Sequence, residues 1–332
     1  MQNMPAQLVH VDDTTPGWSR VRRGKSFSYA DEQGKTIRDS AQLDRIRKLA
    51  IPPAYTEVWI CPSPEGHIQA TARDDKGRKQ YRYHPLWQEH QEHRKFRRML
   101  DFGKRLPILR QKVERDLSRR QCSLVTVTAA VVRLLDRTAL RIGNEEYVSR
   151  NGSYGLSTLK GRHVRFHGDR LTFQFRGKSG VMQKVTLVDR KVSRVVRQCQ
   201  SLPGKRLFQF MDECGQVQSL RSVQVNAYIR SACGASFTAK DFRTWQANVW
   251  ALDLIRSQIL QAPADRVQIV REVAGRLGNT YSVCRKFYIY PAVLDALPTA
   301  IATPTSSSAP LKGLQRVEND LINFLKSHAT KK

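Results

Sequence analysis

The sequence predicts an α+β fold, with a small β-rich N-terminal domain and a larger, mainly α-helical domain that contains an inserted β-hairpin. Up to about residue 83, short strand-like stretches alternate with turn residues. From about residue 88, apolar residues recur at helical spacing instead. The 332 residues, 40% of them hydrophobic, are enough for two cores. We therefore expect domains at residues 1–90 and 91–300, followed by a flexible linker and a helix within residues 301–332.

In the N-terminal domain, strands are expected at residues 27–29, 58–60 and 67–72, each a short run bounded by turn residues. One short helix is expected between the first two strands, because Leu43, Ile46 and Leu49 share a helical face. The basic segment 73–83 that follows is expected to be a loop. By itself such a loop is typical of a general phosphate-binding surface.

In the larger domain, helical spacing continues through residues 124–135, and a helix over residues 132–140 would end just before Arg141. Residues 171–176 alternate in polarity and the alternation returns at 185–187, after the turn 177–180, so Lys178 is expected at a hairpin tip. Another helix is expected to start near Asp241. Residues 301–311 are rich in Ala, Pro, Thr and Ser and are expected to form the linker. The last helix carries Leu314, Val317, Leu321 and Phe324.

Lysine and arginine number 57 against 29 acidic residues, which gives a formal charge of +28. A charge of this size, spread along the whole chain, indicates a polyanionic partner. No stretch approaches the roughly 18 to 20 apolar residues of a membrane span, and the polar first thirty residues lack the apolar core of a signal peptide. We expect a cytoplasmic, nucleoid-associated protein that does not bind a membrane. Its six cysteines form no C-x-x-C pair and are expected to be reduced.

Separate segments supply the groups of a phosphoryl-transfer site that needs no metal. Such a site requires cations around the phosphate oxygens, a nucleophile in line and a proton donor for the leaving oxygen. Two guanidiniums, a lysine, an amide and a phenol meet these requirements. The candidates are Arg141, Lys178, Arg243, Asn279 and Tyr288.

Each candidate also has a structural interpretation. Arg141 would serve as a cation at a helix C-terminus, Lys178 as a solvated turn lysine, and Arg243 as the partner of a carboxylate. The Gly-Lys-Ser at 177–179 is not a P-loop, because Thr172 occupies the position of its first glycine and a hairpin follows.

Two further questions stay open on residues alone. The pairs His90/His93 and His163/His167 have ligand-like spacing but no accompanying Cys, His or Asp set, so no metal site is expected. Three tyrosines compete as the nucleophile, and Tyr281 and Tyr288 share a helical face at a spacing of seven residues. Periodicity does not choose between Tyr281 and Tyr288. The third candidate is Tyr290.

Several short motifs occur in a fixed order along the chain. They are Leu-Arg-Ile-Gly-Asn-Glu-Glu-Tyr at 140–147, Asn-Gly-Ser-Tyr-Gly-Leu-Ser-Thr-Leu at 151–159, Phe-Arg-Gly-Lys-Ser-Gly at 175–180, Lys-Asp-Phe-Arg-Thr-Trp at 240–245, Leu-Gly-Asn-Thr at 277–280, Val-Cys-Arg-Lys-Phe-Tyr-Ile-Tyr-Pro at 283–291 and, upstream, residues 51–55 and 77–83. Taken together, these motifs resemble the type IB DNA topoisomerases of the bacterial and poxvirus branch. The resemblance covers roughly residues 25 to 298, and its order and spacing agree as well: Arg141 and Lys178 are 37 residues apart, and Asn279 and Tyr288 nine.

The resemblance implies roles for single residues. Tyr288 is similar to the family's nucleophile, Arg141 and Arg243 to the arginines on the scissile phosphate, and Lys178 to the lysine that protonates the 5′ oxygen. Asn279 stands where other branches carry histidine, and Lys240 is similar to an auxiliary lysine. Gln80, Tyr81 and Tyr83 resemble DNA-contacting residues of the small domain, beside Arg78, Lys79 and Arg82.

The implied fold is that of tyrosine recombinases and type IB topoisomerases. The implied activity is relaxation of supercoiled double-stranded DNA through a 3′-phosphotyrosyl intermediate, without ATP, by a monomer that clamps the duplex. No cofactor is required, and Mg²⁺ is expected only to stimulate turnover. Two alternatives stay open: a tyrosine recombinase, which shares the catalytic logic but normally has a helical front domain, and a non-catalytic architectural protein that binds DNA.

Overall fold

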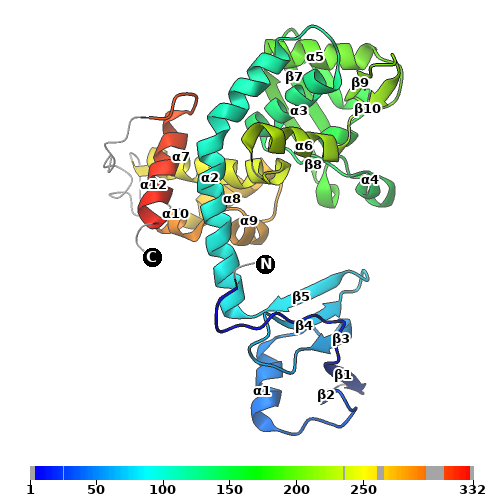
Figure 1. Cartoon of the computed structure of the whole chain (residues 1–332), viewed down its shortest axis with the longest axis vertical. Helices are drawn as coiled ribbons and strands as arrows, with labels where there is room; N and C mark the ends of the chain where they lie inside the picture. The colour runs from blue at the N-terminus through cyan, green and yellow to red at the C-terminus, as the bar shows by residue number, and fades with distance from the viewer. Residues whose placement is uncertain (1–3, 25, 235, 260–264, 297–309, 330–332) are drawn as a thin grey trace. The chain divides into compact units, whose positions relative to one another are not determined.

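The computed structural model describes residues 4–24, 26–234, 236–259, 265–296 and 310–329. The chain forms two compact units, Met1–Lys95 and Phe96–Lys332. The division falls inside helix α2 (Pro85–Leu117), and the boundary expected after residue 90 falls in the same helix. A small β-sheet unit and a larger helical unit (Figure 1) confirm the predicted α+β class.

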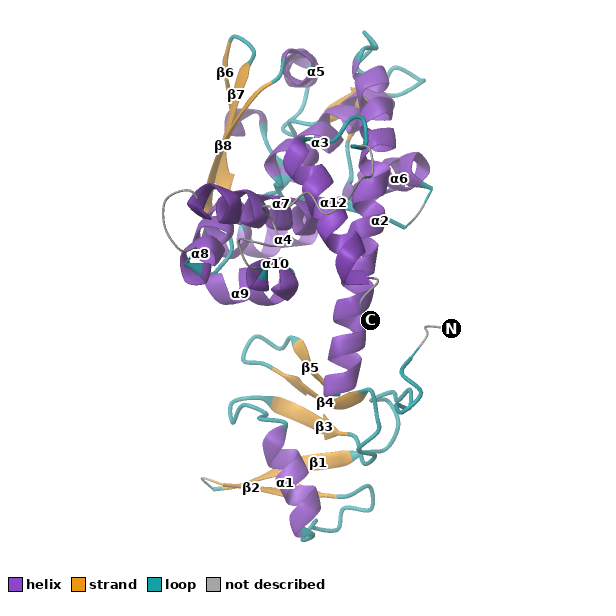
Figure 2. Cartoon of the chain, turned by 90° about the vertical axis from the view of Figure 1, so that its left-hand side faces the viewer, coloured by secondary structure: helices purple, strands orange, loops and turns teal. Residues whose placement is uncertain are grey.

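The N-terminal unit is built on a five-stranded antiparallel sheet, visible in Figure 2, with the strand order β2-β1-β3-β4-β5. Helix α1 (Ser40–Lys48) is capped by Asp39, whose side chain accepts the N–H of Gln42. Ile46 of this helix packs with Trp18 and Ile60 in a small core. The strands are β1 (Trp18–Arg23), β2 (Ser26–Ala30), β3 (Thr56–Ile60), β4 (Ile68–Arg73) and β5 (Lys79–Tyr83).

The structure adds one strand to this unit and corrects one prediction. Strand β1 was not expected, and the segment 73–83 is not a loop, because it ends in the edge strand β5. The side chain of Asp74 closes the turn before β5 by accepting the N–H groups of Lys76 and Arg78. The strand Lys-Gln-Tyr-Arg-Tyr is polar and largely exposed, so it lacks the alternation of buried apolar and exposed polar residues that predicts a strand.

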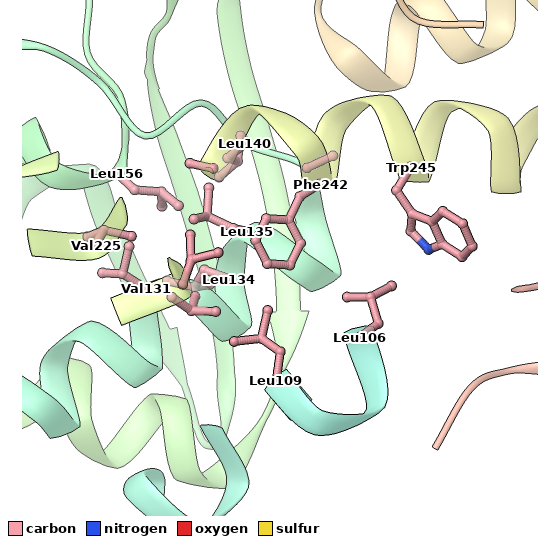
Figure 3. Packing of buried hydrophobic residues seen from close by; sticks show 14 of the residues in the cluster. Leu106, Leu109, Val131, Leu134, Leu135, Leu140, Leu156, Val225, Phe242 and Trp245 are labelled. Atoms are coloured by element: carbon pink, nitrogen blue, oxygen red, sulfur yellow. The ribbon is translucent and has the colours of Figure 1, made fainter. Parts of the chain in front are cut away.

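Helix α3 (Leu124–Thr138) lies in the core of the larger unit, and its residues from 126 to 132 are all buried. Figure 3 shows Leu134 and Leu135 of this helix beside Leu109 of α2 and Phe242 of α7 (Ala239–Ile259). The other helices are α4 (Glu145–Asn151), α5 (Arg190–Ser201), α6 (Ser222–Cys233), α8 (Arg266–Leu277), α9 (Tyr281–Phe287), α10 (Pro291–Asp295) and α12 (Arg316–Ala329).

The predicted hairpin is present as β7 (Arg170–Arg176) and β8 (Met182–Val188), with Lys178 in its turn. The prediction of one hairpin was nevertheless incomplete. Strand β6 (Val164–His167) adds a third strand to this sheet, and β9 (Gln209–Met211) pairs with β10 (Val217–Ser219). Strands of three or four residues are too short to show a period in the sequence.

The C-terminal helix α12 is confirmed, and a buried ion network attaches it to the rest of the unit. Arg110 of α2 donates to both carboxylate oxygens of Asp136 at 2.8 and 2.9 Å and to both of Glu318 at 2.7 Å. The indole N–H of Trp245 also donates to Glu318, at 3.2 Å. One guanidinium thereby connects α2, α3 and α12. Apart from its last two residues, the predicted linker at 301–311 lies outside the described residues.

Among the described residues, no helix has both the length and the apolar character needed to cross a membrane.

We expect Glu318→Gln to destabilise the protein in a pH-dependent way. Burial raises the pKa of Glu318, but the hydrogen bonds and charge of Arg110 outweigh burial, so the pKa lies below its ordinary value. The carboxylate therefore stabilises the fold above its unfolded pKa, and this contribution is lost as pH falls through the folded value. Denaturant unfolding at pH 7 should show a loss of about 1.5–3 kcal/mol, the range of hydrogen bonds to charged groups.

The matched control is Asp44→Asn, which removes the exposed ion pair between Asp44 and Arg47. Exposed pairs contribute about 0–1 kcal/mol. An equal effect of both variants would contradict a stabilising role for the buried network.

Candidate active site

The guanidinium of Arg243 lies at the centre of the candidate site. Its side chain is only 4% exposed. One terminal nitrogen donates to the carbonyl of Ala139 at 2.5 Å and the other to the carbonyl of Leu277 at 2.9 Å. Its central carbon lies 5.3 Å from the ring centroid of Tyr288. This one side chain thus connects the ends of α3 and α8 with the tyrosine.

Helix α7 holds Arg243 in its first turns. Asp241 accepts the N–H and hydroxyl of Thr238 at 2.7 and 3.1 Å, which caps the start of the helix as the sequence predicted. Arg98 donates to both oxygens of the same carboxylate at 2.8 Å. The nearby carboxylate of Asp241 is therefore occupied by Arg98, and it does not neutralise Arg243.

Arg141 lies in an extended segment beyond α3. The predicted helix over 132–140 ends earlier, at Thr138, because Ala139 adopts a left-handed conformation with φ of 51°. The carbonyl of Arg141 then accepts the N–H of Leu156 at 2.9 Å. Gly143 and Gly155 permit this close crossing, since a Cβ on Gly155 would lie 2.5 Å from the backbone of Gly143.

Asn279 follows the end of α8, where Gly278 takes the left-handed conformation and the N–H of Asn279 donates to the carbonyl of Ala274 at 2.9 Å. Its side-chain oxygen accepts a hydrogen bond from Arg141. Its side-chain nitrogen is buried and has no partner among the described residues. A buried amide without a partner is costly, so this N–H₂ is available to an acceptor that enters the site.

Tyr288 directly follows α9, and one asparagine binds the backbone from Tyr288 to Tyr290. The side-chain nitrogen of Asn248 donates to the carbonyl of Tyr288 at 2.9 Å, and its oxygen accepts the N–H of Tyr290 at 2.7 Å. Asn248 is fully buried in α7. Sequence reasoning did not identify this positioning residue, because a single asparagine within an apolar helix carries no motif.

The structure separates the three tyrosines. Tyr281 begins α9 and Tyr288 follows its end, so the two do not share a face of one helix. Tyr290 stacks on Phe96 with ring centroids 3.6 Å apart, and burial raises its pKa. Of the three, Tyr288 is the one beside the guanidiniums. The geometry thereby favours Tyr288 where periodicity did not choose.

The cations change how readily Tyr288 ionises. Burial raises the pKa of the phenol, whereas the charge of Arg243 and a hydrogen bond from it lower the pKa. Arg141 and Lys240 lower it further, and the net pKa lies below the ordinary value of a tyrosine. Lys240 is exposed and contributes through its charge.

The two arginines also act on each other. Burial lowers the pKa of Arg141 to about 10, and repulsion from Arg243 contributes. Burial likewise lowers the pKa of Arg243. Among the described residues, neither guanidinium forms an ion pair with a carboxylate. Two close cations without a counter-charge favour the binding of an anion.

Lys178 is exposed, and in the described part of the chain no hydrogen bond or ion pair holds its ammonium group. The base of its turn is nevertheless fixed beside Asn279. Gln183 of β8 lies against two glycines: a Cβ on Gly177 would be 2.9 Å from its Cγ, and one on Gly278 would be 2.3 Å from its Nε2. The structure thus brings together Arg141, Arg243, Asn279 and Tyr288, with the turn of Lys178 close to Asn279.

The candidate DNA-contacting residues lie on β5 and the turn before it. Tyr81 and Tyr83 are 42% and 37% exposed, and their rings stack with centroids 5.7 Å apart. Lys79 pairs with Asp13 at 2.5 Å, while Arg82 donates to the carbonyl of Ala50 at 2.9 Å. Arg78 and Gln80 both donate to Asp74, at 2.8 and 3.0 Å.

No three potential metal ligands gather anywhere in the part of the chain that the structure describes. The ring of His163 accepts the N–H of Lys160 at 3.1 Å, and His90 stacks on Trp87.

Two family models match different segments of the chain. A model described as "Eukaryotic DNA topoisomerase I, catalytic core" matches residues 84–302, and one described as "Bacterial DNA topoisomerase IB, N-terminal domain" matches residues 26–74. The DNA topoisomerase 1B of Acanthamoeba polyphaga mimivirus is 32% identical over 291 residues, which cover 84% of this chain and 87% of that protein.

Two solved structures of the XerH site-specific recombinase bound to difH substrates have lower similarity. The pre-cleavage complex has a TM-score of 0.37 and 14% identity, covering 58% of this chain and 51% of that chain. The post-cleavage complex has a TM-score of 0.35 and 14% identity, covering 55% of this chain and 47% of that chain. This chain thus covers about half the length of each.

Matches to a catalytic core and to an N-terminal domain of topoisomerases define the class: a DNA-binding isomerase. The chain belongs to the type IB DNA topoisomerase family.

We expect Arg141→Gln to raise the pKa of the Tyr288 phenol, because the charge of Arg141 is one of the causes that lower it. The phenol can be titrated by NMR with ¹³C-labelled tyrosine, without DNA. The pKa of Tyr290, which is raised by burial alone, is the internal control and should not change. An unchanged Tyr288 titration would contradict electrostatic coupling within the site.

Proposed function

We propose that this topoisomerase relaxes supercoiled double-stranded DNA by transient cleavage of one strand through a 3′-phosphotyrosyl intermediate, and that it needs neither ATP nor a metal. The supporting observation is the phenol of Tyr288 beside Arg243 and Arg141, two cations that no carboxylate of the described chain neutralises. Such a site accepts a phosphodiester and activates a phenol at the same position.

In the proposed reaction, Arg141, Arg243 and the free amide N–H₂ of Asn279 bind the non-bridging oxygens of a backbone phosphate. The phenolate of Tyr288 attacks phosphorus in line, a new P–O bond to the tyrosine forms, and the bond to the 5′ oxygen breaks. One phosphodiester replaces another, so the bond energy is conserved. The free 5′ end rotates, re-attacks phosphorus, and releases Tyr288 without ATP.

Lys178 is proposed to give its proton to the departing 5′ oxygen. Its place at an exposed turn, next to the segment of Asn279, supports this role. Lys240 is proposed to assist through its charge, which lowers the pKa of Tyr288.

The N-terminal unit is proposed to bind the duplex through β5, where stacked exposed tyrosines lie among basic residues. Most contacts would be to phosphates, with little sequence preference. We propose that the protein acts as a monomer and that Mg²⁺ affects turnover only through the DNA.

The central test is relaxation of supercoiled plasmid in EDTA without ATP. The wild-type protein should relax the plasmid and become covalently attached to DNA 3′ ends. Tyr288→Phe should lose both activities while DNA affinity changes little, because the removed oxygen is the nucleophile and one of many groups at a cationic surface. Tyr281→Phe and Tyr290→Phe are matched controls that should still form the covalent link. A mobility shift without relaxation by the wild type would contradict the proposal, and site-specific joining would indicate a recombinase.

The acid role of Lys178 can be tested with a substrate that carries sulfur at the 5′ bridging position. A thiolate leaves with little protonation, so cleavage by Lys178→Ala should be slow on the oxygen substrate and largely restored on the sulfur substrate. Arg141→Ala is the control, expected to lose 10² to 10⁵-fold in rate on both substrates, by analogy with the loss of a transition-state clamp. Equal defects of Lys178→Ala on the two substrates would exclude the acid role.

The role of β5 can be tested through the salt dependence of DNA binding. Log affinity should fall linearly with log salt at about 0.9 per phosphate contacted. Replacing Lys79 and Arg82 by alanine should reduce this slope by up to about two units, with little change in single-turnover cleavage on saturating DNA. The control is the alanine double variant of Arg47 and Lys48, two exposed cations in the last turn of α1. An unchanged slope in the β5 variant would mean that this strand does not touch the backbone.

A further inference from the structure

Two thiols of the larger unit are in contact although they are 77 residues apart in the chain. The Sγ atoms of Cys122 and Cys199 lie 3.8 Å from each other, and the Sγ of Cys122 also lies 3.7 Å from the carbonyl oxygen of Gln209. Cys122 precedes Ser123, the capping residue of α3, and Cys199 lies in the last turns of α5. The candidate active site uses neither thiol.

The other four cysteines differ from this pair. Cys61, Cys233 and Cys284 are buried, and Cys214 is exposed. The structure describes all six, and no contact joins any of these four to a second thiol. Within the pair, Cys122 is partly exposed at the end of an exposed turn, while Cys199 is fully buried. One sulfur is thus accessible to a small reagent, and the second lies directly behind it.

We propose that Cys122 and Cys199 form a reactive dithiol that a small disulfide, such as oxidised glutathione, converts into an intramolecular disulfide. The thiolate of Cys122 attacks the reagent, a mixed disulfide forms at Cys122, and one glutathione thiolate leaves. The thiol of Cys199 then attacks the Sγ of Cys122 and forms the S–S bond, while the second glutathione leaves and takes up the proton of Cys199. Two protein thiols are oxidised, and one small disulfide is reduced to two thiols.

The surroundings support this order of steps. The hydrogen bond from Cys199 lowers the pKa of Cys122, and the same contact together with burial raises the pKa of Cys199. The more acidic thiol is therefore also the accessible one, as the attacking position requires. Cys199, without contact to solvent, is placed to resolve the mixed disulfide.

Bond formation needs the sulfurs to approach from 3.8 Å to about 2.05 Å. The turn between α2 and α3, exposed from residue 118 to 121, can supply this small movement. It is already attached to the partner elements, because Gln198 of α5 donates to the carbonyl of Arg120 at 3.0 Å and Met211 of β9 donates to the carbonyl of Cys122 at 3.0 Å. The disulfide would join α5 covalently to the start of α3.

The test is incubation of the full folded chain with oxidised glutathione, followed by alkylation, digestion and mass spectrometry. The expected product is a linked peptide pair containing Cys122 and Cys199, with the loss of two hydrogen atoms, no glutathione on either residue, and reversal by dithiothreitol. Cys214, which is exposed but has no thiol neighbour, should carry glutathione instead and serves as the internal control. Stable glutathione on Cys122, or free Cys122 and Cys199 when Cys214 is fully modified, would overturn the proposal.

Two variants separate the roles of the sulfurs. In Cys199→Ala the resolving thiol is missing, so Cys122 should accumulate the mixed disulfide. In Cys122→Ser the buried Cys199 should stay reduced at a glutathione concentration that modifies Cys214. Modification of Cys199 in this second variant would contradict the assignment of Cys122 as the attacking thiol. Both outcomes are independent of the proposed reaction on DNA.

Discussion

The candidate site depends on one buried guanidinium held by backbone carbonyls. One terminal nitrogen of Arg243 donates to the carbonyl of Ala139, directly after α3. The other donates to the carbonyl of Leu277, the last residue of α8. Carbonyls at helix C-termini are left without helical partners and carry partial negative charge, so they bind a cation well. Because Arg141 and Asn279 each lie two residues beyond these carbonyls, the same bonds fix the distance between them.

This use of arginine contrasts with the ion network around Arg110. There a buried guanidinium has two carboxylates, Asp136 and Glu318, and the charges are neutralised within the protein. At the candidate site the fixing bonds come from neutral carbonyls, which orient Arg243 without removing its charge. The positive charge is therefore still available to a phosphate and to the phenol of Tyr288. The two clusters are connected through α7, since Trp245 bonds to Glu318 two residues after Arg243.

The site also shows how neighbouring cations can lower the pKa of a buried tyrosine. Burial alone would keep the phenol protonated, as it does for Tyr290. The nearby cations outweigh burial and lower the pKa of Tyr288, and Asn248 binds the carbonyl of Tyr288 and the N–H of Tyr290. One helix, α7, thus supplies the cations Arg243 and Lys240, which lower the pKa of Tyr288, and also Asn248, which binds the neighbouring backbone.

The sequence by itself determined the two-part α+β fold, the hairpin with Lys178 and the family, because strong periodicity and short motifs are local properties of the chain. It did not determine β1 or β5, since strands whose residues are largely exposed to solvent lack an alternation of buried apolar and exposed polar residues. It also left Tyr281 and Tyr288 equal as nucleophiles on periodicity. Only the tertiary structure placed Tyr288 beside two guanidiniums and Tyr290 on Phe96. Asn248 and the contact of Cys122 with Cys199 likewise arise from segments far apart in the chain, and no local pattern records which distant residues will meet when the helices pack.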